Sequence, residues 1–147
     1  MSKNSEYYIA IIGGSIAGSE AAYQLAKNGF KIAVFDQMPL PYGKIEDGLP
    51  KWHVKLRDKE EEAIDEKLQD PNIRFIPKCR LGRDIAFESL LQDWKFSAII
   101  LAIGAWRDRP LEIPGIEAFV DKGLIYQNHL IKWFNHYHES DYKGFEY

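Results

Sequence analysis

An apolar run that ends in a glycine-rich turn is the feature that most constrains this chain. The run covers residues 7–12 and is rich in isoleucine, which predicts a short buried strand. Gly13 opens the turn, and a helical pattern over 16–28 begins at once. A second apolar run over 31–35 ends at Asp36. This order of strand, glycine turn, helix, strand and acid is the layout of a dinucleotide-binding βαβ unit.

The residue types of this unit predict where each part of a dinucleotide binds. Gly13 permits a tight turn, and Gly18 lets the helix lie close to the strand. The helix N-terminus exposes unpaired N–H groups, and its dipole favours negative charge, so we expect a pyrophosphate there. Asp36 is expected to accept hydrogen bonds from ribose hydroxyls, and Gln37 is the next candidate for the adenosine. The backbone N–H groups expected to hold the pyrophosphate belong to Gly13, Gly14, Ser15, Ala17 and Gly18.

Ser15 is the departure from the usual motif, because it stands where the middle of three glycines is expected. The backbone must approach the phosphates closely at this point, and a serine side chain adds bulk. Serine is nevertheless small, and its hydroxyl could itself donate to a phosphate. The alternative interpretation is a glycine-rich turn in an α/β protein that binds no nucleotide, with Asp36 as a solvated strand end.

The remainder of the chain continues the alternation of strands and helices. The segment 38–50 holds several prolines and glycines, so it predicts a loop rather than a helix. The alternation predicts an α/β fold, in which a Rossmann-like parallel sheet is flanked by helices and the ligand crosses the carboxyl ends of the strands. The further elements expected are a helix over 53–68, a strand over 73–76, a short helix over 87–93, a central strand over 98–103 and an aromatic helix over 128–137.

Composition narrows the class of protein. The chain has 147 residues, 46% of them hydrophobic, which is enough for one domain with its own core. Its net charge of −3 argues against a nucleic-acid partner, and no apolar run is long enough for a membrane span. A single cysteine, Cys79, excludes an internal disulfide framework, and the polar N-terminus lacks a signal-peptide core. We therefore expect a cytoplasmic protein.

Several segments of the chain, taken in order, resemble those of one known family. They are the glycine turn with Asp36, Pro41-Tyr42-Gly43, Asn72-Ile73-Arg74-Phe75, Gly82-Arg83-Asp84-Ile85, Leu101-Ala102-Ile103-Gly104-Ala105, Leu111-Glu112-Ile113-Pro114-Gly115 and Trp133-Phe134-Asn135. In these segments the chain resembles the N-terminal FAD-binding half of the adrenodoxin reductase (ferredoxin–NADP reductase) and glutamate synthase small-subunit type of pyridine nucleotide oxidoreductase. One departure is the run of Lys44, Ile45 and Glu46, where the family usually has apolar and then basic residues.

The resemblance implies a cofactor, further site residues and partners. It implies bound FAD, with NAD(P)H as reductant in the full-length enzyme and ferredoxin or another iron–sulfur carrier as electron acceptor. It adds Gly43 beside the flavin, Cys79 near the adenine, and Ala102 and Gly104 in a second nucleotide motif. Residues 1–138 would form the FAD-binding domain, and 139–147 a tail or crossover toward a missing NAD(P)-binding domain.

Other kinds of site receive less support from the sequence. A lone Cys79 cannot supply the redox-active pair of a disulfide reductase, and no catalytic triad or zinc pattern is present. The histidines near the end, His129, His136 and His138, lie in an aromatic segment that indicates packing rather than a metal site. A flavoenzyme needs no catalytic side chain of this kind, because the cofactor carries the chemistry. The alternatives are a non-catalytic nucleotide-binding module and an FAD monooxygenase fragment.

Overall fold

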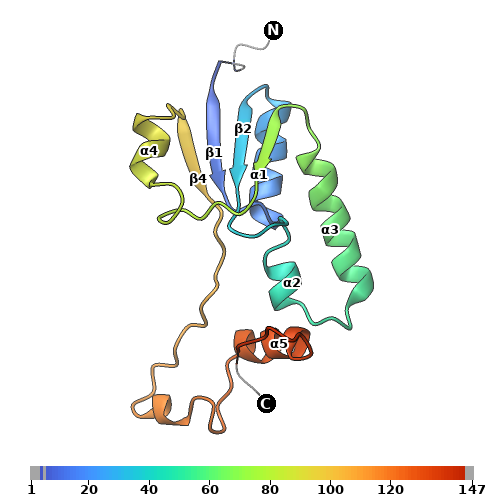
Figure 1. The fold of residues 1–147 in the computed structure, drawn as a ribbon, viewed down its shortest axis with the longest axis vertical. Coiled ribbons are helices and arrows are strands. Elements are labelled where there is room, and N and C mark those ends of the chain that lie inside the picture. Colours follow the sequence, from blue (N-terminus) through green and yellow to red (C-terminus); the bar gives the residue numbers. More distant parts are fainter. Residues whose placement is uncertain (1–3, 5, 145–147) are drawn as a thin grey trace.

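Four parallel strands form the centre of the molecule in the computed structural model, which describes residue 4 and residues 6–144. The strands lie in the order β3-β2-β1-β4, which is the order of a Rossmann sheet around its first strand. Figure 1 shows their carboxyl ends facing α2 and α5. The predicted α/β class is confirmed. The strands are β1 (Tyr8–Ile12), β2 (Lys31–Phe35), β3 (Ile73–Ile76) and β4 (Ala98–Leu101).

Helices cover both faces of the sheet. The α1 and α3 helices pack together on one face, and α4 lies on the other (Figure 1). Two short helices, α2 and α5, lie beyond the carboxyl ends of the strands. The bounds are α1 (Ile16–Lys27), α2 (Lys44–Gly48), α3 (Val54–Leu68), α4 (Phe87–Gln92), a 3-10 turn at Ile116–Phe119 and α5 (Gln127–His136).

The alternation of side chains along β1 divides the core into two layers. Ile9 and Ile11 point toward α1, where the small Ala22 and Ala26 let the helix approach the sheet closely. Ala10 and Ile12 point toward the opposite layer, where Leu90 of α4 is completely buried. The β1 strand is thus buried on both faces, as its unbroken apolar sequence predicts.

Two sequence predictions are wrong in part. The segment 38–50 was expected to contain no helix, yet α2 forms within it and buries Ile45. The run 98–103 was expected to be a central strand, yet β4 ends at Leu101 and lies at the edge of the sheet, half-exposed. An apolar run indicates that a strand packs against other elements, but it does not show which elements these are.

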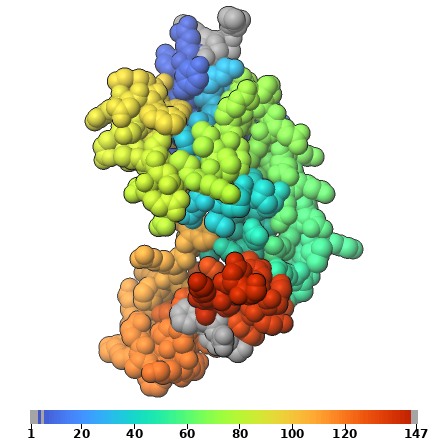
Figure 2. Space-filling view, viewed as in Figure 1, coloured from blue at the N-terminus to red at the C-terminus, as the bar shows by residue number. Residues whose placement is uncertain are grey.

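The segment after β4 leaves the sheet and contacts α2 through Trp106 and through α5. Residues 102–126 project beyond the carboxyl ends of the strands and contain the 3-10 turn, and α5 then packs against α2 (Figure 1). In Figure 2 the red surface of α5 rests directly on the cyan and green surface around α2. Within the described part of the chain, no helix has both the length and the apolar character needed to cross a membrane. The last residues of the predicted tail, 145–147, lie outside the described part.

Candidate nucleotide-binding site

Gly13 makes the tight turn at the end of β1. Its φ of +100° lies in the region that favours glycine, and its N–H donates to the Phe35 carbonyl at 2.7 Å. A Cβ at this position would overlap the carbonyl oxygen of Ala102. Ala102 in turn donates its N–H to the Ile12 carbonyl at 2.8 Å, so the two predicted nucleotide motifs meet at one edge of the sheet.

Gly18 brings α1 against this turn. A Cβ at residue 18 would overlap the Gly13 carbonyl oxygen, which is backbone and cannot move aside as a side chain can. The two glycines therefore define a close contact between strand end and helix that no other residue permits. This is the role the sequence predicted for both.

The N-terminus of α1 has unpaired donors. The first hydrogen bond of the helix runs from the Ser19 N–H to the Ser15 carbonyl at 2.8 Å, and no side chain caps the end. The first turn holds no acidic residue, and Ala17 is exposed. The N–H groups of this turn are thus available to an anion, which the helix dipole also favours.

Asp36 is tied to the glycine turn by its side chain. One carboxylate oxygen accepts the Gly14 N–H at 2.7 Å, and the other accepts the Met38 N–H at 2.9 Å. The residue is only 7% exposed, so these bonds fix a charged group at the end of β2. Each oxygen keeps a further lone pair for a sugar hydroxyl. Gln37, which follows, is exposed, and its position beside Asp36 leaves it accessible.

Ser15 and Gly43 join the turn to the loop that precedes α2. The Ser15 hydroxyl donates to the Tyr42 carbonyl at 2.9 Å, so its proton goes to this carbonyl and not to a phosphate. Gly43 has a φ of +50°, and a Cβ there would lie 3.1 Å from that of Ser15. Serine at this motif position thus fastens the loop to the turn, a role that the sequence alone did not indicate.

The remaining predicted residues differ in how close they lie to this turn. The Cys79 N–H donates to the Asp36 carbonyl at 2.8 Å, which places the cysteine at the same sheet edge. Burial raises the pKa of its thiol, so the cysteine is a poor nucleophile. Gly104 has a φ of +67° but lies in the exposed connection after β4, with no described atom within 4 Å of its Cβ position.

Two apolar side chains that were not predicted as site residues, those of Phe75 and Pro41, complete the surroundings of Gly14. A Cβ on Gly14 would lie 3.0 Å from both the Phe75 ring and the Pro41 side chain. The sequence marked Phe75 only as part of a strand that carries the family resemblance, and did not place it at the glycine turn. It takes this position because β3 pairs with β2 in parallel register, with Phe75 opposite Val34.

The histidines of α5 and the following turn lie away from this edge of the sheet. His136 Nε2 lies 3.0 Å from Asp47, and its Nδ1 lies 2.9 Å from Glu139. His138 is near Lys51. Among the residues that the structure describes, no group of three or more histidine, cysteine or acidic side chains is arranged to hold a metal ion.

A model of the pyridine nucleotide-disulphide oxidoreductase family matches residues 7–134. The chain belongs to this family. It is 30% identical over 133 residues to the glutamate synthase [NADPH] small chain of Mycobacterium tuberculosis, covering 90% of this chain and 26% of that protein. It is 28% identical over 136 residues to the NADPH-ferredoxin reductase FprA of the same organism, covering 88% and 28%. The resemblance predicted from the sequence is confirmed.

Structural similarity supports the same assignment. A solved structure of M. tuberculosis FprA matches with a TM-score of 0.73 and 27% identity, over 88% of this chain and 29% of that one. The Rossmann-type fold of the oxidoreductase family is therefore established for these residues. The chain spans between about a quarter and three tenths of the length of these relatives. Other relatives differ in the acceptor they are named for: the NADPH-Fe(3+) oxidoreductase subunit beta of Geobacter sulfurreducens is 34% identical over 113 residues.

Proposed function

We propose that residues 1–138 form the FAD-binding domain of an NAD(P)H-dependent flavoprotein oxidoreductase. The observation that carries the proposal is the contact between Gly13 and Gly18, which aims the open first turn of α1 at the carboxyl edge of the sheet. A diphosphate suits that position because it satisfies several N–H donors and the helix dipole at once. The family match to oxidoreductases supports the same reading.

Each residue of the site has a distinct part in holding FAD. The N–H groups of Ser15, Ala17 and Gly18 are proposed to bind the pyrophosphate, with Gly13 and Gly14 allowing its close approach. The carboxylate of Asp36 is proposed to bind the ribose, because two backbone donors already hold it in place. The other contacts proposed for the cofactor are those of Gln37, Gly43, Cys79, Ala102 and Gly104.

The whole protein's activity is proposed from the relatives. NADPH appears in the names of the glutamate synthase small chain and of FprA, and ferredoxin in that of FprA. We propose NAD(P)H as the reductant, bound by a domain beyond residue 138, with 139–147 as the crossover toward it. Ferredoxin or another iron–sulfur carrier is the proposed acceptor, in the cytoplasm. Bound FAD would supply the redox chemistry, and the chain described here would position and tune it.

The test is a titration of the full chain with FAD and, separately, with NADPH, followed by visible absorbance and flavin fluorescence. We expect FAD to bind with a perturbed flavin spectrum, because Asp36 and the α1 turn are preformed. We expect NADPH alone not to bind. Selective binding of NADPH with no binding of FAD would overturn the cofactor assignment.

A further inference from the structure

Asn135 of α5 is a polar residue with a completely buried side chain. It is 0% exposed, and its carboxamide contacts only backbone atoms of the segment around the end of α2. Its Nδ2 donates to the Glu46 carbonyl at 2.8 Å and to the Leu49 carbonyl at 2.9 Å. Its Oδ1 accepts the Lys51 N–H at 3.0 Å. Every hydrogen of this amide is therefore used on a segment more than 80 residues away in the sequence.

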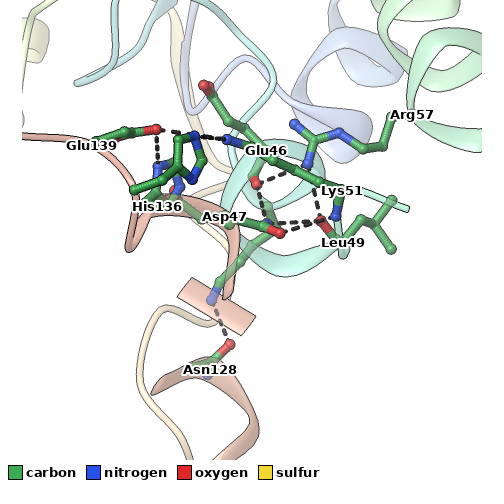
Figure 3. Close-up of polar contacts among 11 residues, drawn as sticks. Glu46, Asp47, Leu49, Lys51, Arg57, Asn128, His136 and Glu139 are labelled. Carbon is green, nitrogen blue, oxygen red and sulfur yellow. Dashed lines mark hydrogen bonds and ion pairs between the residues drawn. The ribbon is translucent and has the colours of Figure 1, made fainter. Parts of the chain in front are cut away.

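The carbonyls that Asn135 binds are the ones that a short helix leaves unpaired. The last carbonyls of a helix have no intrahelical donor, and α2 has only one turn to stabilise it. Arg57 of α3 donates to the same two carbonyls, at 3.3 Å to Glu46 and 3.0 Å to Leu49 (Figure 3). Asn135 and Arg57 thus hold the C-terminal end of α2 from two sides.

The N-terminal end of α2 touches the glycine turn. Gly43 is the N-cap residue of α2, and it packs against Ser15, whose hydroxyl donates to the Tyr42 carbonyl. The short helix therefore connects Asn135 to the turn at the end of β1. Two further contacts join α2 to α5: the Lys44 ammonium donates to Asn128 at 2.6 Å, and Asp47 lies 3.0 Å from His136 (Figure 3).

We propose that Asn135 is a positioning residue for the cofactor: by fixing α2 it holds Gly43 and Tyr42 against Ser15 of the glycine turn. The inference rests on the proposed function, because it assumes that FAD binds at that turn. Asn135 itself lies beyond contact with the turn and acts through α2. Its side chain hydrogen-bonds only to backbone atoms, so it fixes the backbone conformation of residues 46–51 whatever their side chains are.

The matched pair of variants is Asn135→Asp and Asn128→Asp, which lie on the same helix. Asp at 135 keeps the shape but turns both donors into an acceptor that faces two carbonyls. Asp at 128 keeps the oxygen that accepts from Lys44, so that contact survives. We expect Asn135→Asp to weaken FAD binding by about tenfold, the size of effect seen for mutations that act through a packed network. Asn128→Asp should bind like wild type.

Amide hydrogen exchange of the full chain without FAD tests the role of Asn135 separately from the proposed FAD-binding function. In Asn135→Asp we expect faster exchange at residues 43–51 and also at residues 15–18, which it does not touch. This measurement decides whether Asn135 holds the glycine turn through α2 even if wild type binds no FAD, a result that would count against the proposed function. Exchange that changes only in α5 and at 46–51, with unchanged FAD affinity and flavin spectrum, would show a purely local structural role and overturn the proposal.

A second variant covers the case in which Asn135→Asp does not fold. Arg57→Leu removes the other donor to the same two carbonyls. If α2 transmits its position to the glycine turn, this variant must also quicken exchange at residues 15–18. An unchanged turn in a folded Arg57→Leu protein would contradict the proposal.

Discussion

The glycine turn and the C-terminal segment are built by opposite means. The turn follows β1, which is buried on both faces, and its geometry depends on backbone contacts that leave no space for a Cβ. The segment 102–144 lies outside the sheet, is largely exposed, and joins the remainder mainly through the contacts of α5 with α2. Figures 1 and 2 show this division.

The comparison shows which interactions fix the conformation of each region. In the turn, sterics fix the conformation, so the proposed cofactor site needs few side chains. In the C-terminal segment, the buried Asn135 carboxamide of α5 and a few polar contacts fix the conformation around the end of α2, which lies beyond the sheet. Changes of equal size should therefore have unequal effects in the two regions.

The largest effect is expected for Gly18→Ala. The added Cβ would overlap the Gly13 carbonyl, and overpacking of this kind costs about 1–3 kcal/mol. We expect lower stability in urea unfolding and no measurable FAD binding. Gly48→Ala is the control, because the atoms nearest to a Cβ there belong to the Lys44 side chain, the closest at 3.1 Å. If both variants bind FAD equally, the close contact is not what shapes the site.

Asp36→Asn should have the next largest effect. Its two oxygens accept from Gly14 and Met38, so an amide group must turn its NH₂ toward one of these donors. A buried donor left without an acceptor costs about 1–3 kcal/mol, and FAD affinity should fall as well. The comparison is Asp70→Asn, where one oxygen accepts the Asn72 N–H and an amide serves equally well. Thermal unfolding and FAD titration measure both variants.

Glu139→Gln should give a smaller effect that depends on pH. Hydrogen bonding to His136 lowers the pKa of Glu139 below its usual 4.5. A carboxyl with a lowered pKa stabilises the fold above its usual value, and the stabilisation is lost as the pH falls through the folded pKa. Wild type should therefore exceed Glu139→Gln in melting temperature near neutrality, and the two should converge in acid.

The control for this pH series is Glu112→Gln. Glu112 pairs with Arg109 at 3.6 Å, but both side chains are almost fully exposed, so the pair contributes little. Its melting temperature should follow wild type at every pH. A Glu139 difference that persists unchanged in acid would mean that the His136 contact does not stabilise α5.

The smallest effect concerns Cys79, at the sheet edge beside Asp36. Because burial raises its pKa, less of the thiol is ionised at neutral pH than in the unfolded chain. Alkylation of the folded protein should therefore be several-fold slower than alkylation in denaturant. Equal rates would show that the Asp36 edge opens readily.

The regular parts of the fold could be predicted because their signals are local. The bounds of β2 and β3 match the prediction, and those of β1, α1, α3 and α4 differ from it by one residue at one end. The structure also places the predicted glycines in the turn and Asp36 beside it, because the motif fixes their spacing, but the N–H groups of Gly13 and Gly14 donate to Phe35 and Asp36. Gly29, just after the end of α1, has the left-handed φ of +89° that is common where a helix stops.

The parts that could not be predicted depend on contacts between distant residues. The α2 helix lies in a proline- and glycine-rich segment, where Asn135 and Arg57 bind its terminal carbonyls, and no local pattern shows these contacts. The Ser15 hydroxyl, which the sequence offered as one more donor for a phosphate, donates to the Tyr42 carbonyl. The position of β4 at the sheet edge depends on pairing order, which an apolar run does not specify.

The most direct test of the account is to follow the backbone amides of the full chain by NMR while FAD is added. The account predicts that the largest shifts fall on the N–H groups of Ser15, Ala17 and Gly18, with the Asp36 region next. Shifts that leave this turn unchanged and gather elsewhere would contradict it.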